Sequence, residues 1–275
     1  MGSMPNAPTE PVALTGQVLL YDKPELLSKD AHAKLGVDIA PTRFTFAAKT
    51  HVVPLTVPEF GPASLSFPII FAGDQFYPMA VFGLREGENL FADETTGFEF
   101  DAYVPCYVRR YPFVLASTDA ASANGQGDQM LVGIDRGYPY LREGGEFQLF
   151  EENGEPSQYT KNCIQFCNDF ETQNRMTQSF VQLLRDNDLL EPRTVEYQPR
   201  NPDGSAVGGP QKVAEFTAVS EAKLNALPAE KLVELRGNGA LAQIYAHLNS
   251  LFNWERLIVK QMARTQAQQP QAANA

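Results

Sequence analysis

The sequence predicts an α+β fold in which a β-rich, mostly antiparallel N-terminal half packs against a long helix and C-terminal helices. As far as about Asp135, short apolar segments of strand length alternate with Pro and Gly. After Pro156 the apolar residues recur at helical spacing. Because strands come first and helices later, without regular alternation, the order favours an α+β fold over a doubly wound parallel sheet.

Length and composition predict a single domain. The chain has 275 residues, of which 43% are hydrophobic and 20% charged, as is ordinary for a globular protein with a sizeable core. We expect this domain over residues 12–264. Residues 1–11 read as a flexible N-terminus that starts with an expression scar, and residues 265–275 read as a disordered polar tail.

Seven segments are predicted to be strands because they are short and rich in Val, Ile, Phe and Tyr. They are Val18–Tyr21, Thr42–Ala47, His51–Val57, Phe67–Ala72, Tyr77–Phe82, Phe113–Ser117 and Met130–Ile134. Between them, residues 86–101 form an acidic, turn-rich stretch, and residues 118–129 form a loop of small and polar residues.

A long helix is predicted over residues 157–187, since one stripe of residues recurs at alternating spacings of four and three. The stripe consists of Phe166, Phe170, Gln173, Thr177, Phe180 and Leu184. Pro156 and Ser157 suit the start of this helix, and Pro192 prevents its continuation. Gln173 and Thr177 interrupt the apolar stripe. Either the helix meets a polar pocket there, or the two side chains satisfy each other and nearby backbone groups.

A hairpin and further helices are predicted to complete the fold. Strands at 194–198 and 212–217 flank the turn-rich residues 199–210, where Asn-Pro and Asp-Gly pairs are strong turn signals. Ser220 caps a short helix, and Pro228 begins another that a Gly-rich stretch ends. An apolar stripe from Leu241 to Ile258 predicts the last helical segment.

Charge and hydropathy exclude some partners and locations. Acidic residues outnumber basic ones by 33 to 22, and the net charge of -11 repels phosphate backbones, so we do not expect nucleic acid as a partner. The apolar runs are far shorter than the roughly 20 residues of a membrane-spanning helix. No basic-then-apolar leader starts the chain, so we expect a cytoplasmic location. The many aromatic residues are compatible with a homodimer as well as with a large core.

The cysteines are expected to be thiols. Cys106, Cys163 and Cys167 are an odd number in a large chain, which argues against a disulfide framework. Cys163 and Cys167, four apart, share one face of the predicted helix and could bind a metal ion. No second Cys/His pair lies nearby, and small buried hydrophobic roles are commoner for free cysteine.

The sequence holds none of the common catalytic motifs, such as GxGxxG, GxxxxGK[ST], HExxH or GxSxG. A non-haem iron site of two histidines and one carboxylate can be drawn from His51, Glu59 and His247, so an oxygenase-like, iron-dependent enzyme is an alternative. Glu59 also follows Pro58 at a plausible helix start, where a carboxylate caps well. His247 also fits the boundary of an apolar helical stripe. No other cofactor is implied.

The segment YVPCYVRRYPF places two arginines among aromatic residues. Between its two prolines it can form a single helical turn, from which Arg109 and Arg110 point to different faces. One guanidinium is expected to pair with a carboxylate of residues 86–101, and the other to grip an anionic ligand. Both can instead be structural anchors, which is the commoner role of isolated arginines among aromatic residues. The predicted ligand contacts are Arg109, Arg110, Tyr103, Tyr107, Gln173 and Thr177.

The chain resembles the SapC family, which is named after a bacterial surface-array locus. The matching segments run from about residue 12 to 260: HAKLGV, VPEFGPASLSFPIIF, PMAVFGLREGENLF, YVPCYVRRYPF, GEFQLFEENGEP and GNGALAQIYAHLNSLFNWERL. The family name implies an association with the surface layer. The resemblance also implies a gene encoded beside those of outer-membrane uptake receptors, flavin halogenase-like proteins and cupin-like proteins. It assigns no catalytic residue. It draws attention to Glu59, Phe60 and residues 109–113.

These observations predict a binding or accessory protein rather than an enzyme, recognising a small anionic ligand or a peptide segment of a partner. Two alternatives stay open. One is the iron-dependent enzyme described above. The other is a structural component of a surface layer, which conflicts with the missing export signal.

Overall fold

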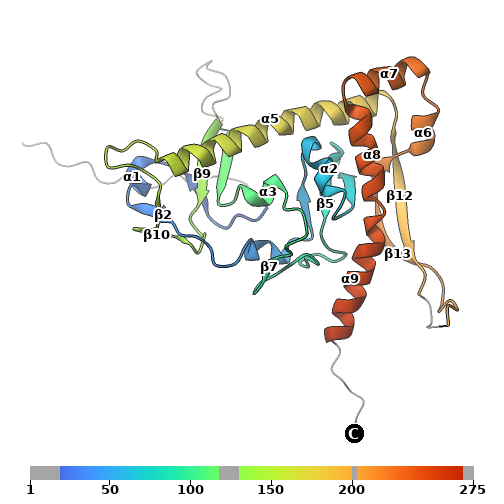
Figure 1. The fold of residues 1–275 in the computed structure, drawn as a ribbon, viewed down its shortest axis with the longest axis horizontal. Helices are drawn as coiled ribbons and strands as arrows, with labels where there is room; N and C mark the ends of the chain where they lie inside the picture. Colours follow the sequence, from blue (N-terminus) through green and yellow to red (C-terminus); the bar gives the residue numbers. More distant parts are fainter. Residues whose placement is uncertain (1–18, 118–129, 200–202, 269–275) are drawn as a thin grey trace, which may run out of the picture. The chain divides into compact units, whose positions relative to one another are not determined.

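The computed structural model describes residues 19–117, 130–199 and 203–268 (Figure 1). The predictions for residues 1–11, 118–129 and 269–275 lie outside the described residues. The fold is α+β, with antiparallel sheets in the N-terminal half, one long helix and a set of C-terminal helices, as the sequence predicts. The chain divides into two compact units. Unit 1 comprises residues 1–43 and 108–172, and unit 2 comprises residues 44–107 and 173–275. The single domain expected over residues 12–264 stays a prediction.

Unit 1 contains two small antiparallel sheets, with strand orders β1-β9-β8 and β10-β2-β11. Its elements are β1 (Pro24–Leu26), α1 (Lys29–His32), β2 (Leu35–Val37), β8 (Phe113–Ser117), β9 (Met130–Asp135), β10 (Leu141–Glu143) and β11 (Phe147–Gln148). The predicted strands Phe113–Ser117 and Met130–Ile134 are confirmed as β8 and β9, since both are runs of β-branched and aromatic residues.

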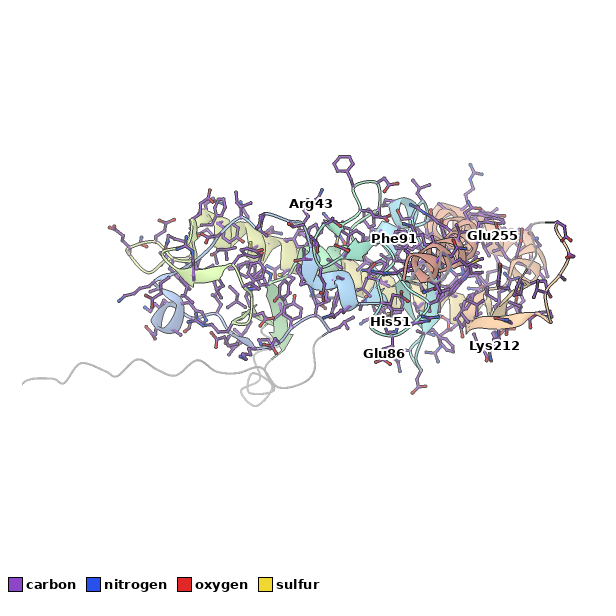
Figure 2. All side chains as sticks on the ribbon, turned by 90° about the horizontal axis from the view of Figure 1, so that it is seen from below. Arg43, His51, Glu86, Phe91, Lys212 and Glu255 are labelled. Atoms are coloured by element: carbon purple, nitrogen blue, oxygen red, sulfur yellow. The ribbon has the colours of Figure 1, made fainter. Side chains whose placement is uncertain are left out.

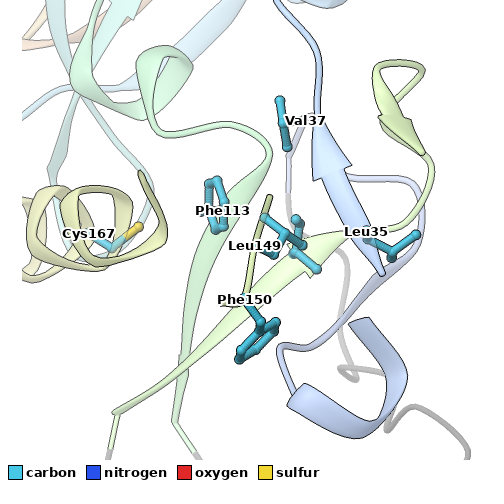
Figure 3. Close-up of a cluster of buried hydrophobic side chains, with 7 residues drawn as sticks. Leu35, Val37, Phe113, Leu149, Phe150 and Cys167 are labelled. Carbon is cyan, nitrogen blue, oxygen red and sulfur yellow. The ribbon is translucent and has the colours of Figure 1, made fainter. Parts of the chain in front are cut away.

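The core of unit 1 is a cluster of buried side chains from both sheets and the long helix (Figure 3). Its members are Leu35, Val37, Phe113, Ile134, Leu149, Phe150 and Cys167. Within the second sheet the backbone approaches closely at Gly36 of β2 and Gly145, which lies between β10 and β11; an added Cβ on Gly145 would lie 2.4 Å from the carbonyl oxygen of Gly36. This explains the glycine at the start of the GEFQLF segment, because a larger residue would collide with the neighbouring backbone.

The long helix α5 (Gln158–Asp186) confirms the predicted helix over residues 157–187. Ser157 caps its start, since its hydroxyl accepts a hydrogen bond of 3.2 Å from the Thr160 backbone N–H. Asp188 just after the helix has a positive φ of 51°, the left-handed conformation that often ends a helix. Residues 158–172 belong to unit 1 and residues 173–186 to unit 2.

Unit 2 is built on an antiparallel sheet of order β12-β13-β4-β5-β3. The strands of unit 2 are β3 (Val52–Pro54), β4 (Ile69–Ala72), β5 (Tyr77–Val81), β6 (Ala92–Asp93), β7 (Gly97–Phe98), β12 (Leu190–Tyr197) and β13 (Gln211–Val219). β6 and β7 pair with each other in a separate two-stranded sheet. The helices of unit 2 are η1 (Thr45–Lys49), η2 (Val57–Glu59), α2 (Phe60–Ala63), α6 (Glu221–Asn225), α7 (Ala229–Gly237), α8 (Ala240–Ser250) and α9 (Asn253–Gln268). The predicted hairpin is confirmed, and β12 and β13 pair from Leu190 with Val219 to Tyr197 with Gln211.

Aromatic side chains form the core of unit 2. Phe60 is fully buried and makes edge contacts with Phe71 of β4 and Phe180 of α5, at ring-centroid distances of 6.5 and 5.8 Å. α8 packs on the sheet, where the Ser250 hydroxyl accepts a hydrogen bond of 3.0 Å from the Ile69 backbone N–H. α8 and α9 run beside the β12–β13 hairpin (Figure 1). Within the described ranges, no helix is both long and apolar enough to cross a membrane.

Two predicted strands are wrong. Thr42–Ala47 contains the start of the 3-10 helix η1, because Phe44 adopts a positive φ of 59° and turns the chain where an extended strand was expected. In Val18–Tyr21, the described residues 19–21 form no strand, and the first strand begins at Pro24. The predicted tail also starts too early, since α9 continues through Gln268.

Candidate functional site

The two arginines of the YVPCYVRRYPF segment lie on aromatic rings of α5. The guanidinium carbon of Arg109 lies 5.4 Å from the ring centroid of Phe166. That of Arg110 lies 4.6 Å from the centroid of Phe170 and 5.8 Å from that of Tyr21. Arg109 is exposed, whereas Arg110 is half-buried between its two rings. Such cation–π contacts stabilise the packing of residues 109–110 on the helix.

The two arginines are expected to differ in their effect on stability. Replacing Arg110 by alanine should lower the free energy of unfolding by about 1–2 kcal/mol, because a half-buried cation and its stem leave two rings. Arg109→Ala should cost less than about 1 kcal/mol, because that side chain is exposed. Urea denaturation of the two variants measures this difference. A larger loss in Arg109→Ala than in Arg110→Ala would contradict the assignment.

A buried carboxylate in unit 1, absent from the predicted set of residues, lies next to this segment. Asp135 at the end of β9 is fully buried and accepts a hydrogen bond of 2.9 Å from the Tyr111 hydroxyl. The backbone N–H groups of Asp22, Lys23 and Gly137 also donate to it, at 2.9, 2.8 and 2.9 Å. Burial, together with the charge of Asp135, raises the pKa of Tyr111 above its usual value. This carboxylate therefore anchors Tyr111 and the chain before β1.

Glu59 forms a comparable centre in unit 2. It is 3% exposed, and Oε2 accepts hydrogen bonds from the Thr56 backbone N–H and hydroxyl at 3.0 and 2.7 Å. Oε1 accepts from the Tyr103 hydroxyl at 3.0 Å and from the Cys106 backbone N–H at 2.6 Å. Thr56 and Glu59 form a capping box at the start of η2, as the capping explanation predicts.

Gln173 and Thr177 dock α5 onto the same turn, residues 56–59. The Thr177 hydroxyl donates to the backbone oxygen of Gln173 at 2.7 Å and accepts from the Val57 backbone N–H at 2.9 Å. Oε1 of Gln173 lies 3.0 Å from the Thr56 hydroxyl. Tyr107, another predicted ligand contact, is buried. The polar groups of Gln173, Thr177 and Tyr103 thus all bond to this turn or to each other.

His51, Glu59 and His247 do not form a metal-ligand set. No group of three or more His, Cys, Asp or Glu residues that could hold a metal ion occurs in residues 19–117, 130–199 and 203–268. His51, labelled in Figure 2, is half-buried, and its carbonyl accepts from the backbone N–H groups of Phe82 and Gly83. His247 is fully buried in α8, and its Nε2 accepts from the Val219 backbone N–H at 3.0 Å. Burial lowers the pKa of His247 to about 3, so the ring is neutral.

The acidic stretch of residues 86–101 forms ion pairs with α9. Ion pairs join Arg256 to Asp101, Lys260 to Glu99 and Arg264 to Glu88, and Lys49 pairs with Glu94. The three basic residues of α9 are spaced by four, so they lie on one helix face and meet the acidic stretch together. This spacing is the sequence signal that could have identified the partner of the stretch.

The cysteines are thiols. Burial raises the pKa of Cys163 and of Cys167 to about 11, so both carry their protons at neutral pH. Neither is then suited to act as a nucleophile, because the thiolate is the reactive form. Their place in the core cluster of unit 1 agrees with the small hydrophobic role.

A cavity of about 530 Å³ lies in unit 2 at the start of α8, which we call the α8 cavity. The turn at residues 56–59 and α5 form the walls of the cavity, and the residues that begin α8 form one end of it. Its lining residues are Val57, Pro58, Met176, Ser179, Phe180, Leu183, Asn238, Gly239, Ala240 and Gln243. Gln173 and Thr177 do not line it, but their bonds hold α5 on the turn that does. None of the lining residues was among the predicted ligand contacts; Phe180 was predicted only as part of the helical stripe, and Val57 and Pro58 only as the end of a strand and the start of a helix.

The sequence could not indicate this cavity, because its apolar walls come from two segments more than a hundred residues apart that also read as ordinary core. No curated protein and no solved structure matches the chain. A family model described as SapC matches residues 27–257, which is most of the chain. All six segments that carry the predicted resemblance lie within this range. The chain therefore belongs to the SapC family.

Proposed function

We propose that this protein is a binding protein for a small anionic ligand with an apolar body, which it holds in the α8 cavity. The observation that carries the proposal is the division of the cavity into apolar walls and one polar end. A volume of about 530 Å³ lies in the usual range for small-molecule sites. Such sites combine apolar walls with a few polar groups that orient the ligand.

The walls suit the apolar body of a ligand. Val57, Pro58, Phe180 and Leu183 present hydrocarbon surface, and Met176, which is 54% exposed, adds a flexible thioether side chain at the opening. Burial of the apolar part of a ligand against these side chains supplies the main favourable free energy, at about 25 cal/mol per Å² of apolar surface.

The polar end suits an anion. Ala240 begins α8, a helix of eleven residues; its own N–H donates to Oδ1 of Asn238 at 3.0 Å, but the first turn of a helix as a whole favours negative charge. Gln243 lines the same end, and its Oε1 is buried without a hydrogen-bond partner among the described residues. Rotation of this amide by a half-turn presents its N–H₂ group to a ligand oxygen instead. None of the described lining residues is acidic, so no negatively charged side chain among them repels an anion despite the net charge of -11.

The lining also favours binding over catalysis. It contains no His, Cys, Asp, Glu or Lys that could act as a general acid, general base or activated nucleophile. The one hydroxyl, that of Ser179, belongs to an exposed side chain with no basic neighbour in the lining. A binding or accessory role is therefore the function that this site supports best.

Octanoate is expected to raise the melting temperature of the protein by about 3 °C at ten times its dissociation constant, by ligand linkage. Octanol, which has the same chain and no charge, should give a much smaller rise. Ser179→Phe should abolish the response by filling the cavity from an exposed position. Gln178→Phe is the matched control, since it adds the same bulk one residue away and outside the lining. Differential scanning fluorimetry measures all four responses.

Two results would contradict the proposal. If octanoate, benzoate and phenyl phosphate all leave the melting temperature unchanged, the α8 cavity does not bind small anions. If they raise it equally in Ser179→Phe, the anion binds elsewhere. Arg109→Ala and Arg110→Ala in the same assay then test the other predicted anion contact, since loss of the response in either variant would move the site to those arginines.

A further inference from the structure

A second and larger hollow in unit 2 runs along the edge strand β12 and is lined on its other side by α8 and α9. Its volume is about 860 Å³. β12 contributes residues 192–196 to one side, and the end of α8 and the first turns of α9 form the other. We call it the β12 groove. It shares no lining residue with the α8 cavity, so the two sites can bind different ligands.

The floor of the β12 groove is aromatic. Phe216 of β13 and Trp254 of α9 are stacked, with ring centroids 5.1 Å apart and an angle of 27° between the rings. Phe252, between α8 and α9, lines the same hollow and is 79% exposed. A large aromatic side chain left in solvent beside an aromatic floor is typical of surfaces that bind a partner.

Trp254 also presents an unused hydrogen-bond donor. The residue is 5% exposed, and its Nε1 has no hydrogen-bond partner among the described residues. An indole N–H can only donate, and buried donors in native proteins nearly always have an acceptor. Trp254 lines the β12 groove, but its Nε1 atom is itself covered, so neighbouring side chains in the groove must move apart before a ligand can supply that acceptor.

The charged groups around the groove are mainly acidic. Glu196, Glu221 and Glu255 line it, and none of the three takes part in an ion pair or side-chain hydrogen bond with the described residues. Glu255, at the start of α9, is exposed. The one basic side chain in the lining, Arg193, already has Glu191 at 3.6 Å. The groove therefore favours a positively charged occupant.

We propose that the β12 groove docks a basic segment of a partner protein. Lysine or arginine side chains of such a segment would pair with the three carboxylates, and their apolar stems would lie on Phe252. A backbone carbonyl would accept the hydrogen bond from the Trp254 indole. Only a peptide combines these properties, since a protonated polyamine has positive charge but no acceptor, and a nucleic acid has the wrong charge.

The chain itself does not supply this segment. Of the residues outside the described ranges, 1–18, 118–129 and 269–275 contain no lysine or arginine, and 200–202 contain one, Arg200, which is no basic segment. A second copy of the chain, with a net charge of -11, is repelled at long range. A basic segment of another protein has the charge that the groove lacks, and this complementarity favours it as the occupant.

Trp254 is the only tryptophan of the chain, so its fluorescence reports on the groove directly. The probe is a short acetylated and amidated peptide in which lysine and leucine alternate. We expect it to change the emission of Trp254 in a saturable way, whereas the same peptide with glutamate in place of lysine has no effect. Spermine, a polycation without acceptors, should bind at least tenfold more weakly than the lysine peptide.

Variants assign the binding to these residues. With a fluorescein-labelled lysine peptide followed by anisotropy, the Glu196→Gln and Glu255→Gln double variant should bind about tenfold more weakly, since both changed side chains are exposed and the fold is unaffected. Trp254→Phe should bind about fivefold more weakly through the lost hydrogen bond. Glu230→Gln, which removes an exposed carboxylate of α7 outside the groove, is the control and should bind like the parent protein.

Three results would overturn the proposal. The first is equal binding of the lysine and glutamate peptides. The second is unchanged affinity in the Glu196→Gln and Glu255→Gln double variant. The third is binding of spermine as tight as that of the lysine peptide, which would identify a polyamine site instead of a protein-docking groove. Octanoate bound in the α8 cavity affects none of these comparisons, so this test stands apart from that of the proposed function.

Discussion

Replacing Glu59 by alanine is expected to lower the free energy of unfolding by about 3–5 kcal/mol. The carboxylate is buried and accepts four hydrogen bonds, from two groups of Thr56, the Tyr103 hydroxyl and the Cys106 backbone N–H. Alanine removes the acceptor of all four; the Thr56 hydroxyl can turn to Oε1 of Gln173, but each buried donor that is left unpaired costs about 1–3 kcal/mol before relaxation. Urea denaturation of purified Glu59→Ala measures the loss.

Two further variants separate the sources of this effect. Tyr103→Phe removes one donor and leaves the carboxylate with three, so it should cost about 1 kcal/mol. Glu59→Gln keeps the shape but turns an N–H₂ group toward donors, so its cost should fall between those of the other two variants. If Glu59→Ala unfolds within about 1 kcal/mol of the parent protein, the network does not hold this turn in place.

Acid is expected to destabilise the protein through His247. Its pKa is lowered to about 3 by burial in the folded state, whereas an unfolded histidine has its ordinary value near 6.5. Between these values the unfolded chain binds more protons than the folded one, so stability is complete above about pH 6.5 and falls as the pH decreases toward 3. This residue alone should remove about 2 kcal/mol between pH 8 and pH 5.

The matched control is His247→Gln, which cannot titrate but keeps an oxygen able to accept the Val219 backbone N–H. The two proteins should be compared by urea denaturation at pH 8 and pH 5. The parent protein should lose about 2 kcal/mol more than the variant over this interval. Parallel losses in both proteins would show that the ring gains its proton in the folded state without cost, contrary to its burial.

Local patterns identified most of the secondary structure. The long helix was predictable because Phe166, Phe170, Phe180 and Leu184 recur at helical spacing over many turns. Phe113–Ser117 was predictable because β-branched and aromatic residues dominate it. Thr42–Ala47 failed because its composition resembles a strand, while the left-handed backbone at Phe44 depends on the surrounding packing.

The candidate site was much less predictable. Gln173 and Thr177 stood out as polar residues on an apolar stripe, and both indeed meet a polar feature, the turn at residues 56–59. Gln243 and Trp254, which carry the two proposals, looked like ordinary helix residues. What distinguishes them is a polar atom left without a partner after folding. No pattern within one segment contains that information.

The sequence by itself determined the family, the order of strands and helices, and the acidic character of the chain, since these depend on composition and on neighbours along the chain. The tertiary structure alone decided the fate of each charge. It enclosed Glu59 and Asp135 among hydrogen-bond donors, paired residues 86–101 with α9, and left the carboxylates of the β12 groove without ion-pair partners among the residues that the structure describes. The physical reason is that the energy of a charge depends on its burial and on nearby partners, and both are set by segments that are distant in the sequence.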